Sequence, residues 1–108
     1  MPEYTIPRTE APPPGEGRTL EIDGHDIALY NVDGAFYATD DFCKHRGGHL
    51  GEGALSETCV TCPDHGWRYD VTSGQCLSHP NGDIRAYPVR DAGDHLVLTA
   101  DPPFAKLF

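Results

Sequence analysis

The sequence predicts an all-β fold, a small β-sandwich or partly open barrel with an inserted lobe of two hairpin loops. Three observations support this class. The 108 residues include 12 Gly and 10 Pro, which favour turns and interrupt helices. Short runs of alternating apolar and polar residues are bounded by turn residues, and no stretch keeps a helical apolar period. A chain of this length buries one core, so we expect a single domain over residues 1–108.

The first part of the chain predicts a three-stranded antiparallel meander. Residues 1–17 form a polar, Pro-rich segment that precedes it. Residues 18–23 alternate polar and apolar side chains and end at Asp23-Gly24, a dipeptide suited to a tight hairpin turn. Residues 25–31 form the return strand, and Asp33-Gly34 repeats the turn signal before the third strand. Residues 18–40 are therefore expected to pair as consecutive strands.

The middle of the chain predicts two loops that carry chemistry. Residues 41–53 hold four glycines from Gly47 onward, too many for the interior of a strand or helix, so this segment is a loop. A strand over residues 59–61 leads to Cys62, a loop follows, and residues 67–71 run back to a turn at residues 72–74. Residues 43–78 are therefore expected to form a small lobe. Strands near residues 84–90 and 95–100 complete the sheet, after a tight loop at residues 79–82.

Composition restricts the function and the compartment. The formal net charge of −9 argues against nucleic-acid binding, which needs basic patches. An acidic surface either favours basic protein partners or simply keeps the protein dispersed. The N-terminus has no apolar stretch of signal-peptide or membrane-span length, so we expect a soluble cytoplasmic protein that does not act at a membrane. Without export, four cysteines indicate metal ligation and spare buried thiols rather than disulfides.

Two short motifs each supply one thiolate and one imidazole. Cys43-Lys44-His45 lies in the first loop and Cys62-Pro63-Asp64-His65 in the second, which together offer two Cys and two His. A structural zinc ion accepts such a set, and the chain would then be a zinc-stapled binding module. Zinc sites usually group Cys and His by type, whereas here each loop contributes one of each. This order suits two adjacent metal ions, one bound by both Cys and the other by both His.

These residues resemble the Rieske [2Fe-2S] family, whose signature is CxH followed by CPxHG and an aromatic segment. The likeness extends to Gly47, Leu50, Gly53, Gly66, Trp67, Tyr69, Asp70 and Gly74. The resemblance implies one [2Fe-2S] cluster per chain, with Cys43 and Cys62 on the inner iron and His45 and His65 on the outer iron near the surface.

The resemblance also implies how neighbouring residues tune the cluster. Tyr69 is retained and can donate a hydrogen bond towards a ligand sulfur, whereas Trp67 stands where respiratory Rieske proteins carry a Ser. Asp64 adds negative charge between two ligands. We therefore expect a reduction potential near the low end of the Rieske range, about −150 mV. Pro80 either covers the cluster, as a proline loop does in relatives, or is an ordinary turn residue.

The function implied is that of a soluble ferredoxin of the dioxygenase type. It would take one electron from a flavin-dependent ferredoxin reductase and deliver it to a terminal, aromatic ring-hydroxylating oxygenase, as a monomer and not as an enzyme by itself. A Rieske small subunit of a larger oxidoreductase, such as an assimilatory nitrite reductase, is the alternative. Cys59 and Cys76 are expected to be buried thiols rather than a redox pair. His49 is expected on the loop surface, where it could touch a partner.

Overall fold

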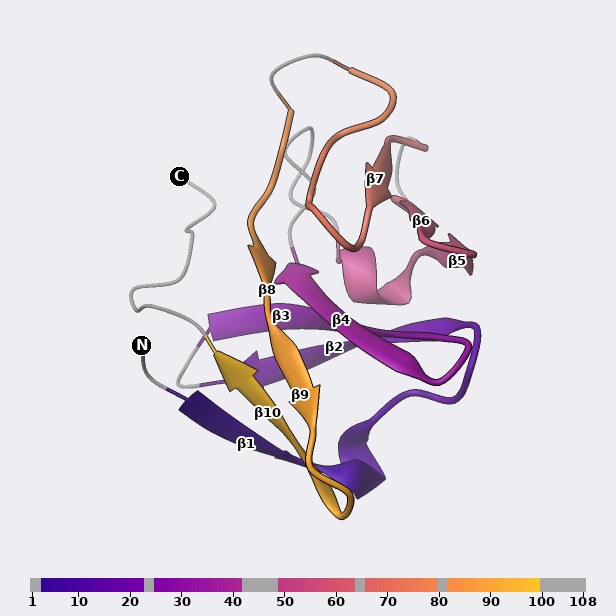
Figure 1. The fold of residues 1–108 in the computed structure, drawn as a ribbon. Helices are drawn as coiled ribbons and strands as arrows, with labels where there is room; N and C mark the ends of the chain where they lie inside the picture. Colours follow the sequence, from indigo (N-terminus) through magenta and orange to yellow (C-terminus); the bar gives the residue numbers. More distant parts are fainter. Residues whose placement is uncertain (1–2, 23–24, 42–48, 64–65, 80–81, 100–108) are drawn as a thin grey trace.

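A computed structural model describes residues 3–22, 25–41, 49–63, 66–79 and 82–99 of the chain (Figure 1). Within these ranges the elements are strands and two short 3₁₀ helices, which confirms the all-β class. None of the described helices is long and apolar enough to cross a membrane. The elements are β1 (Glu3–Pro7), η1 (Arg8–Glu10), β2 (Glu16–Ile22), β3 (His25–Val32), β4 (Ala35–Asp40), η2 (Leu50–Glu52), β5 (Ala54–Ser56), β6 (Cys59–Thr61), β7 (Arg68–Asp70), β8 (Ala86–Tyr87), β9 (Val89–Asp91) and β10 (His95–Thr99).

The described strands form three antiparallel sheets. Their orders are β1-β10-β9, β2-β3-β4-β8 and β5-β6-β7. The predicted meander is confirmed, since β2, β3 and β4 pair in sequence, and Asp33 and Gly34 both take the positive φ that a type I′ turn requires. In Figure 1, β5, β6 and β7 lie on one side of the β2-β3-β4 layer and β1, β9 and β10 lie toward the other.

Strand β3 is buried on both faces and separates two cores. Ile27 and Leu29 pack into a cluster with residues of β1, β4 and β10, whereas Ala28 and Tyr30 pack into a cluster with residues of η2, β6 and β7. Successive side chains of a strand point to opposite faces, so one apolar run serves both cores. The β2-β3-β4 sheet is therefore the central layer, and the short β5-β6-β7 sheet is anchored on it.

Two features of the sheets differ from the prediction. The polar N-terminal segment contains β1, which pairs along its length with β10 and buries Ile6. The expected strand near residues 84–90 is divided at Pro88 into β8 and β9, which belong to different sheets. Proline has no N–H to donate to a ladder, so it marks the point where the chain leaves one sheet and joins the next.

Candidate metal centre

The second predicted ligand loop starts from a buried cysteine at the end of β6. Cys62 is buried in the core between the sheets, and its N–H donates to the carbonyl of Trp67 at 2.7 Å. The Gly66 N–H donates back to the Cys62 carbonyl at 3.1 Å, with Gly66 at φ +77°. These two bonds close the base of the loop. The predicted ligand His65 and its neighbour Asp64 lie outside the described residues.

The first predicted ligand loop is closed at its base by Asp41. The Leu50 N–H donates to the Asp41 carbonyl at 2.6 Å, and the Gly51 N–H donates to Asp41 Oδ1 at 2.9 Å. Thr19 Oγ1 of β2 donates to the same Oδ1 at 2.8 Å. The predicted ligands of this loop, Cys43 and His45, lie outside the described residues.

Two glycines bring the bases of the two loops into direct contact with the sheets. A Cβ at Gly51 would lie 2.5 Å from the backbone of Arg18 and Thr19, so η2 lies directly against β2. A Cβ at Gly53 would lie 2.2 Å from the carbonyl oxygen of Thr61, the residue before Cys62. The return of the first loop therefore touches the strand that leads to the second loop, and only glycine permits this approach.

His49 lies beside the base of the first loop, on the surface as expected. Its Nδ1 is 2.5 Å from Asp41 Oδ2, and about half of its side chain is exposed, 52%. The hydrogen bond to Asp41 is the main cause that raises the pKa of His49, and the nearby carboxylates of Glu52 and Asp26 act in the same direction. His49 thus links the surface to a buried carboxylate.

Trp67 and Tyr69 lie on the segment that returns from the second loop, and both contact the core cluster that contains Cys62. The ring of Trp67 stacks on His79 with centroids 3.8 Å apart and an angle of 14° between the ring planes. Tyr69 is fully buried and belongs to the same core cluster as Cys62. The segment after β7 is held against this loop, since the Arg68 N–H donates to Ser78 Oγ at 3.0 Å. Pro80 follows this segment and lies outside the described residues.

The remaining cysteines do not form a disulfide with each other. Cys76 is buried, and its N–H donates to Asp83 Oδ1 at 2.8 Å, which fits the expected buried thiol. Cys59 is only partly buried, in β6. Both thiols are free.

Asp40 and Asp41 are structural residues of the site that were not predicted from the sequence. Asp40 Oδ2 accepts the Arg85 N–H at 3.0 Å, and Asp40 Oδ1 accepts the Tyr87 hydroxyl. Both carboxylates are buried, with relative exposures of 2% and 1%. The available signal was the pair of adjacent acids at the end of a largely apolar strand, two residues before Cys43. Buried acids need several hydrogen-bond donors, and the backbone N–H groups of a closing loop supply them.

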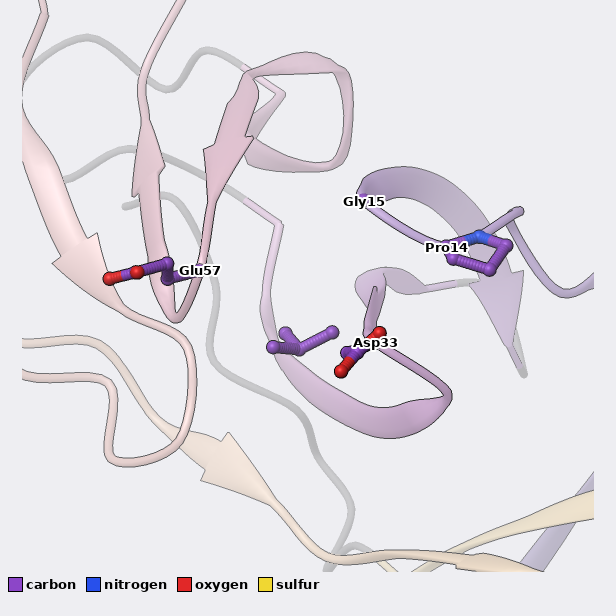
Figure 2. Close-up of a pocket in the computed structure, with 5 residues that line it drawn as sticks. Pro14, Gly15, Asp33 and Glu57 are labelled. Atoms are coloured by element: carbon purple, nitrogen blue, oxygen red, sulfur yellow. The ribbon is translucent and has the colours of Figure 1, made fainter.

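A surface hollow of about 340 Å³ lies away from these loop bases (Figure 2). Figure 2 shows that its walls come from separate turns, with Asp33 at the β3–β4 turn and Glu57 at the β5–β6 turn. Pro14, Gly15 and Val32 complete the lining. The hollow is open, has no aromatic side chain in its lining and carries its two carboxylates on separate turns, so its lining does not indicate a substrate site.

The described part of the centre fits an iron–sulfur cluster. It provides a buried thiol at Cys62, a buried aromatic core beside it, and two closed loop bases in contact through Gly53 and Thr61. A mixed thiolate and imidazole donor set on two such loops is the chemistry that a Rieske centre requires. When bound, the cluster supplies one-electron oxidation and reduction.

The described residues form a small antiparallel protein in which the bases of two loops lie in contact. The sequence matches the Rieske [2Fe-2S] domain over residues 3–88. The chain belongs to the Rieske [2Fe-2S] family, and the zinc-stapled module is not supported.

Relatives and solved structures agree with this membership. The chain is 39% identical over 79 residues to the ferredoxin component of the naphthalene 1,2-dioxygenase/salicylate 5-hydroxylase systems of Ralstonia sp. This alignment covers 72% of this chain and 76% of the relative. It is 37% identical over 88 residues to the biphenyl dioxygenase ferredoxin subunit of Pseudomonas sp. (strain KKS102), with 80% and 81% covered. The fold is similar to a chain from the complex of reduced oxygenase and oxidised ferredoxin in carbazole 1,9a-dioxygenase, at TM-score 0.78 and 27% identity, with 89% and 91% covered.

Proposed function

We propose that this chain is a ferredoxin that carries one electron on a single Rieske [2Fe-2S] cluster bound by Cys43, His45, Cys62 and His65. It takes the electron from a flavin-dependent reductase and passes it to a terminal, ring-hydroxylating oxygenase, as a monomer in the cytoplasm. The observation that carries this proposal is the likeness to ferredoxin components of aromatic dioxygenase systems over more than two thirds of both chains. The complex of oxygenase and ferredoxin among the similar structures supports the oxygenase as partner.

The donor set supports electron carriage at moderate potential. Two imidazoles in place of two thiolates leave the centre less negative than a four-Cys cluster, so an added electron is better tolerated. The absence of a Ser at Trp67 and the negative charge of Asp64 support a potential near the low end of the Rieske range, about −150 mV. Voltammetry measures this value directly, and a clearly positive potential would contradict this tuning.

The surface beside the second loop supports contact with another protein. Leu77, 48% exposed, is the exposed large apolar residue among the described ranges, and its N–H donates to the Arg68 carbonyl at 2.7 Å. Arg68 is also exposed and is one of only 8 bases against 17 acids in the chain. The Trp67–His79 stack lies beside them in sequence. An apolar residue with a base next to a redox centre suits a brief encounter with an electron-transfer partner.

The test compares two cysteine variants in a reconstituted electron chain. Cys62→Ser is expected to abolish the visible colour and the reductase-driven, oxygenase-coupled electron transfer, because it removes a proposed ligand. Cys59→Ser is the matched control, since Cys59 lies three residues earlier and is a free thiol. It should keep both properties. A Cys62→Ser protein that retains the cluster, or a wild-type protein that holds zinc instead of iron, would refute the proposal.

The nitrite reductase alternative receives less support. Solved small subunits of putative nitrite reductases share the fold at TM-scores of 0.80 and 0.79, but only 20% and 21% of residues are identical, so they bear on the fold alone. A stable native complex with a large reductase subunit would favour this alternative over a mobile carrier.

A further inference from the structure

We propose that Asp41 is a positioning residue that fixes both ends of the first ligand loop and thereby holds Cys43 and His45 in the geometry that the cluster needs. The inference rests on the proposed function, because it takes these two residues as ligands. Asp41 acts through the loop and is not itself a ligand.

The carboxylate of Asp41 joins the end of β4 to two other segments, β2 and residues 49–51. Oδ1 accepts from Thr19 Oγ1 of β2 at 2.8 Å and from the Gly51 N–H of η2 at 2.9 Å, while Oδ2 faces His49 Nδ1 at 2.5 Å. The carbonyl of the same residue accepts the Leu50 N–H at 2.6 Å. The residues on either side of the 42–48 interval are therefore held together by one side chain and one backbone bond.

The loop base depends on these hydrogen bonds for its stability because Asp41 is buried. Its relative exposure is 1%, so water cannot replace a lost partner. An apolar residue at this position would leave the Gly51 N–H and the Thr19 hydroxyl without their acceptor, and a buried unsatisfied donor carries a full desolvation penalty. The loop would then relieve the penalty by moving its base away from β2.

Asp40, the residue before Asp41 at the end of β4, provides a matched control for the substitution of Asp41. It is equally buried, but its carboxylate binds the Arg85 N–H and the Tyr87 hydroxyl on the segment that leads into β8. Adjacent residues of an extended strand point to opposite faces, which explains why the two acids serve different segments. Removing Asp40 should therefore cost stability without opening the base of the first loop.

The experiment compares Asp41→Ala with Asp40→Ala in the cluster-loaded full chain. The readouts are the rate of cluster loss to excess chelator, the paramagnetic resonance spectrum of the reduced protein, the reduction potential and the thermal midpoint. We expect both variants to unfold at lower temperature. Asp41→Ala should lose the cluster about tenfold faster or more and show an altered spectrum, whereas Asp40→Ala keeps the wild-type spectrum.

Asp41→Asn tests whether cluster retention depends on the hydrogen bonds that close the loop base or on the negative charge of the carboxylate. The Asn Oδ1 can still accept from Thr19 and Gly51, and its amide can donate to a neutral His49 ring, so it should restore most of the wild-type spectrum. Equal behaviour of Asp41→Asn and Asp41→Ala would overturn the inference, as would an Asp41→Ala spectrum and loss rate equal to those of Asp40→Ala. If Asp41→Ala does not fold, Thr19→Val removes one donor of the same carboxylate and must raise the loss rate above that of Asp40→Ala.

The outcomes separate this inference from the proposed function. A wild-type protein without a [2Fe-2S] cluster refutes the proposed function. A wild-type protein with the cluster, together with Asp41 variants that match the Asp40 control, refutes only the role of Asp41.

Discussion

The contact between the two loop bases predicts that Gly53→Ala loosens the metal centre. Gly53 sits at φ −77° and ψ 168°, where alanine is unstrained, so the substitution acts only through the added methyl group. That carbon would lie 2.2 Å from the Thr61 carbonyl oxygen, whereas real contacts stay above 3.0 Å. The backbone of the first loop and the end of β6 must therefore separate by at least about 0.8 Å.

The expected cost of this separation is that of overpacking between two backbone segments, about 1–3 kcal/mol. Because alanine also restricts the unfolded chain, about 0.4–1 kcal/mol of this cost is offset. For a domain of this size the apparent Tm should fall by roughly 2–15 °C. Cluster loss to excess chelator, followed by visible absorbance, should accelerate because the stems of both ligand loops are displaced.

Gly34→Ala is the matched control for this prediction. Gly34 has φ +93°, and a Cβ there would meet no atom within 4 Å, so alanine costs stability through backbone strain alone, about 1–2 kcal/mol. Gly34 lies at the far end of β4 from Asp41. Gly34→Ala should lower the Tm but leave the rate of cluster loss unchanged. A Gly53→Ala protein that loses its cluster no faster than Gly34→Ala would refute the reasoning.

Three further predictions follow from the described contacts. Arg8→Ala removes the paired bonds to Asp91, so the pKa of Asp91 should rise from about 2 towards its ordinary value of 3.8, and an unchanged carboxyl titration by NMR would contradict this. The raised pKa of His49 means that its pair with Asp41 stabilises the fold fully at pH values below the ordinary His pKa, about 6.5. This stabilisation is lost as pH rises through the raised pKa, and an NMR titration of the His49 ring with a pKa at or below the ordinary value would contradict the prediction. Deleting residues 1–7 removes β1 and exposes the facing core, so the Tm should fall by more than about 10 °C in a circular dichroism melt, and an unchanged Tm would show that β1 contributes little.

Local signals predicted the central sheet and the two loop stems well. The Asp33-Gly34 turn and the alternating strands around it predicted the meander, because both are properties of neighbouring residues. The pairing of β1 with β10 joins opposite ends of the chain. In the segment Glu3–Pro7 only Ile6 is buried. The local pattern of apolar residues therefore did not predict β1, which forms because it pairs with β10. Long-range pairing is decided by the assembled core rather than by local propensity.

The sequence led to the candidate ligands, which stay a prediction, but not to the residues that close the two loops. Cys62 and Tyr69 occupy one buried cluster, as a metal-bearing loop base requires. The cooperation of Asp41 with Thr19, Gly51 and His49 depends on three segments that meet only in the fold. An acid before a cysteine looks in sequence like an ordinary polar loop residue, and its burial is what distinguishes it.

The most direct test of the proposed cluster is metal analysis of the purified protein combined with paramagnetic resonance before and after one-electron reduction. We expect iron and acid-labile sulfide in equal amounts, two of each per chain, and a spectrum that is silent when oxidised and shows one unpaired spin when reduced. The signal should disappear in Cys62→Ser and persist in Cys59→Ser. A colourless protein that contains zinc and stays silent on reduction would contradict the assignment.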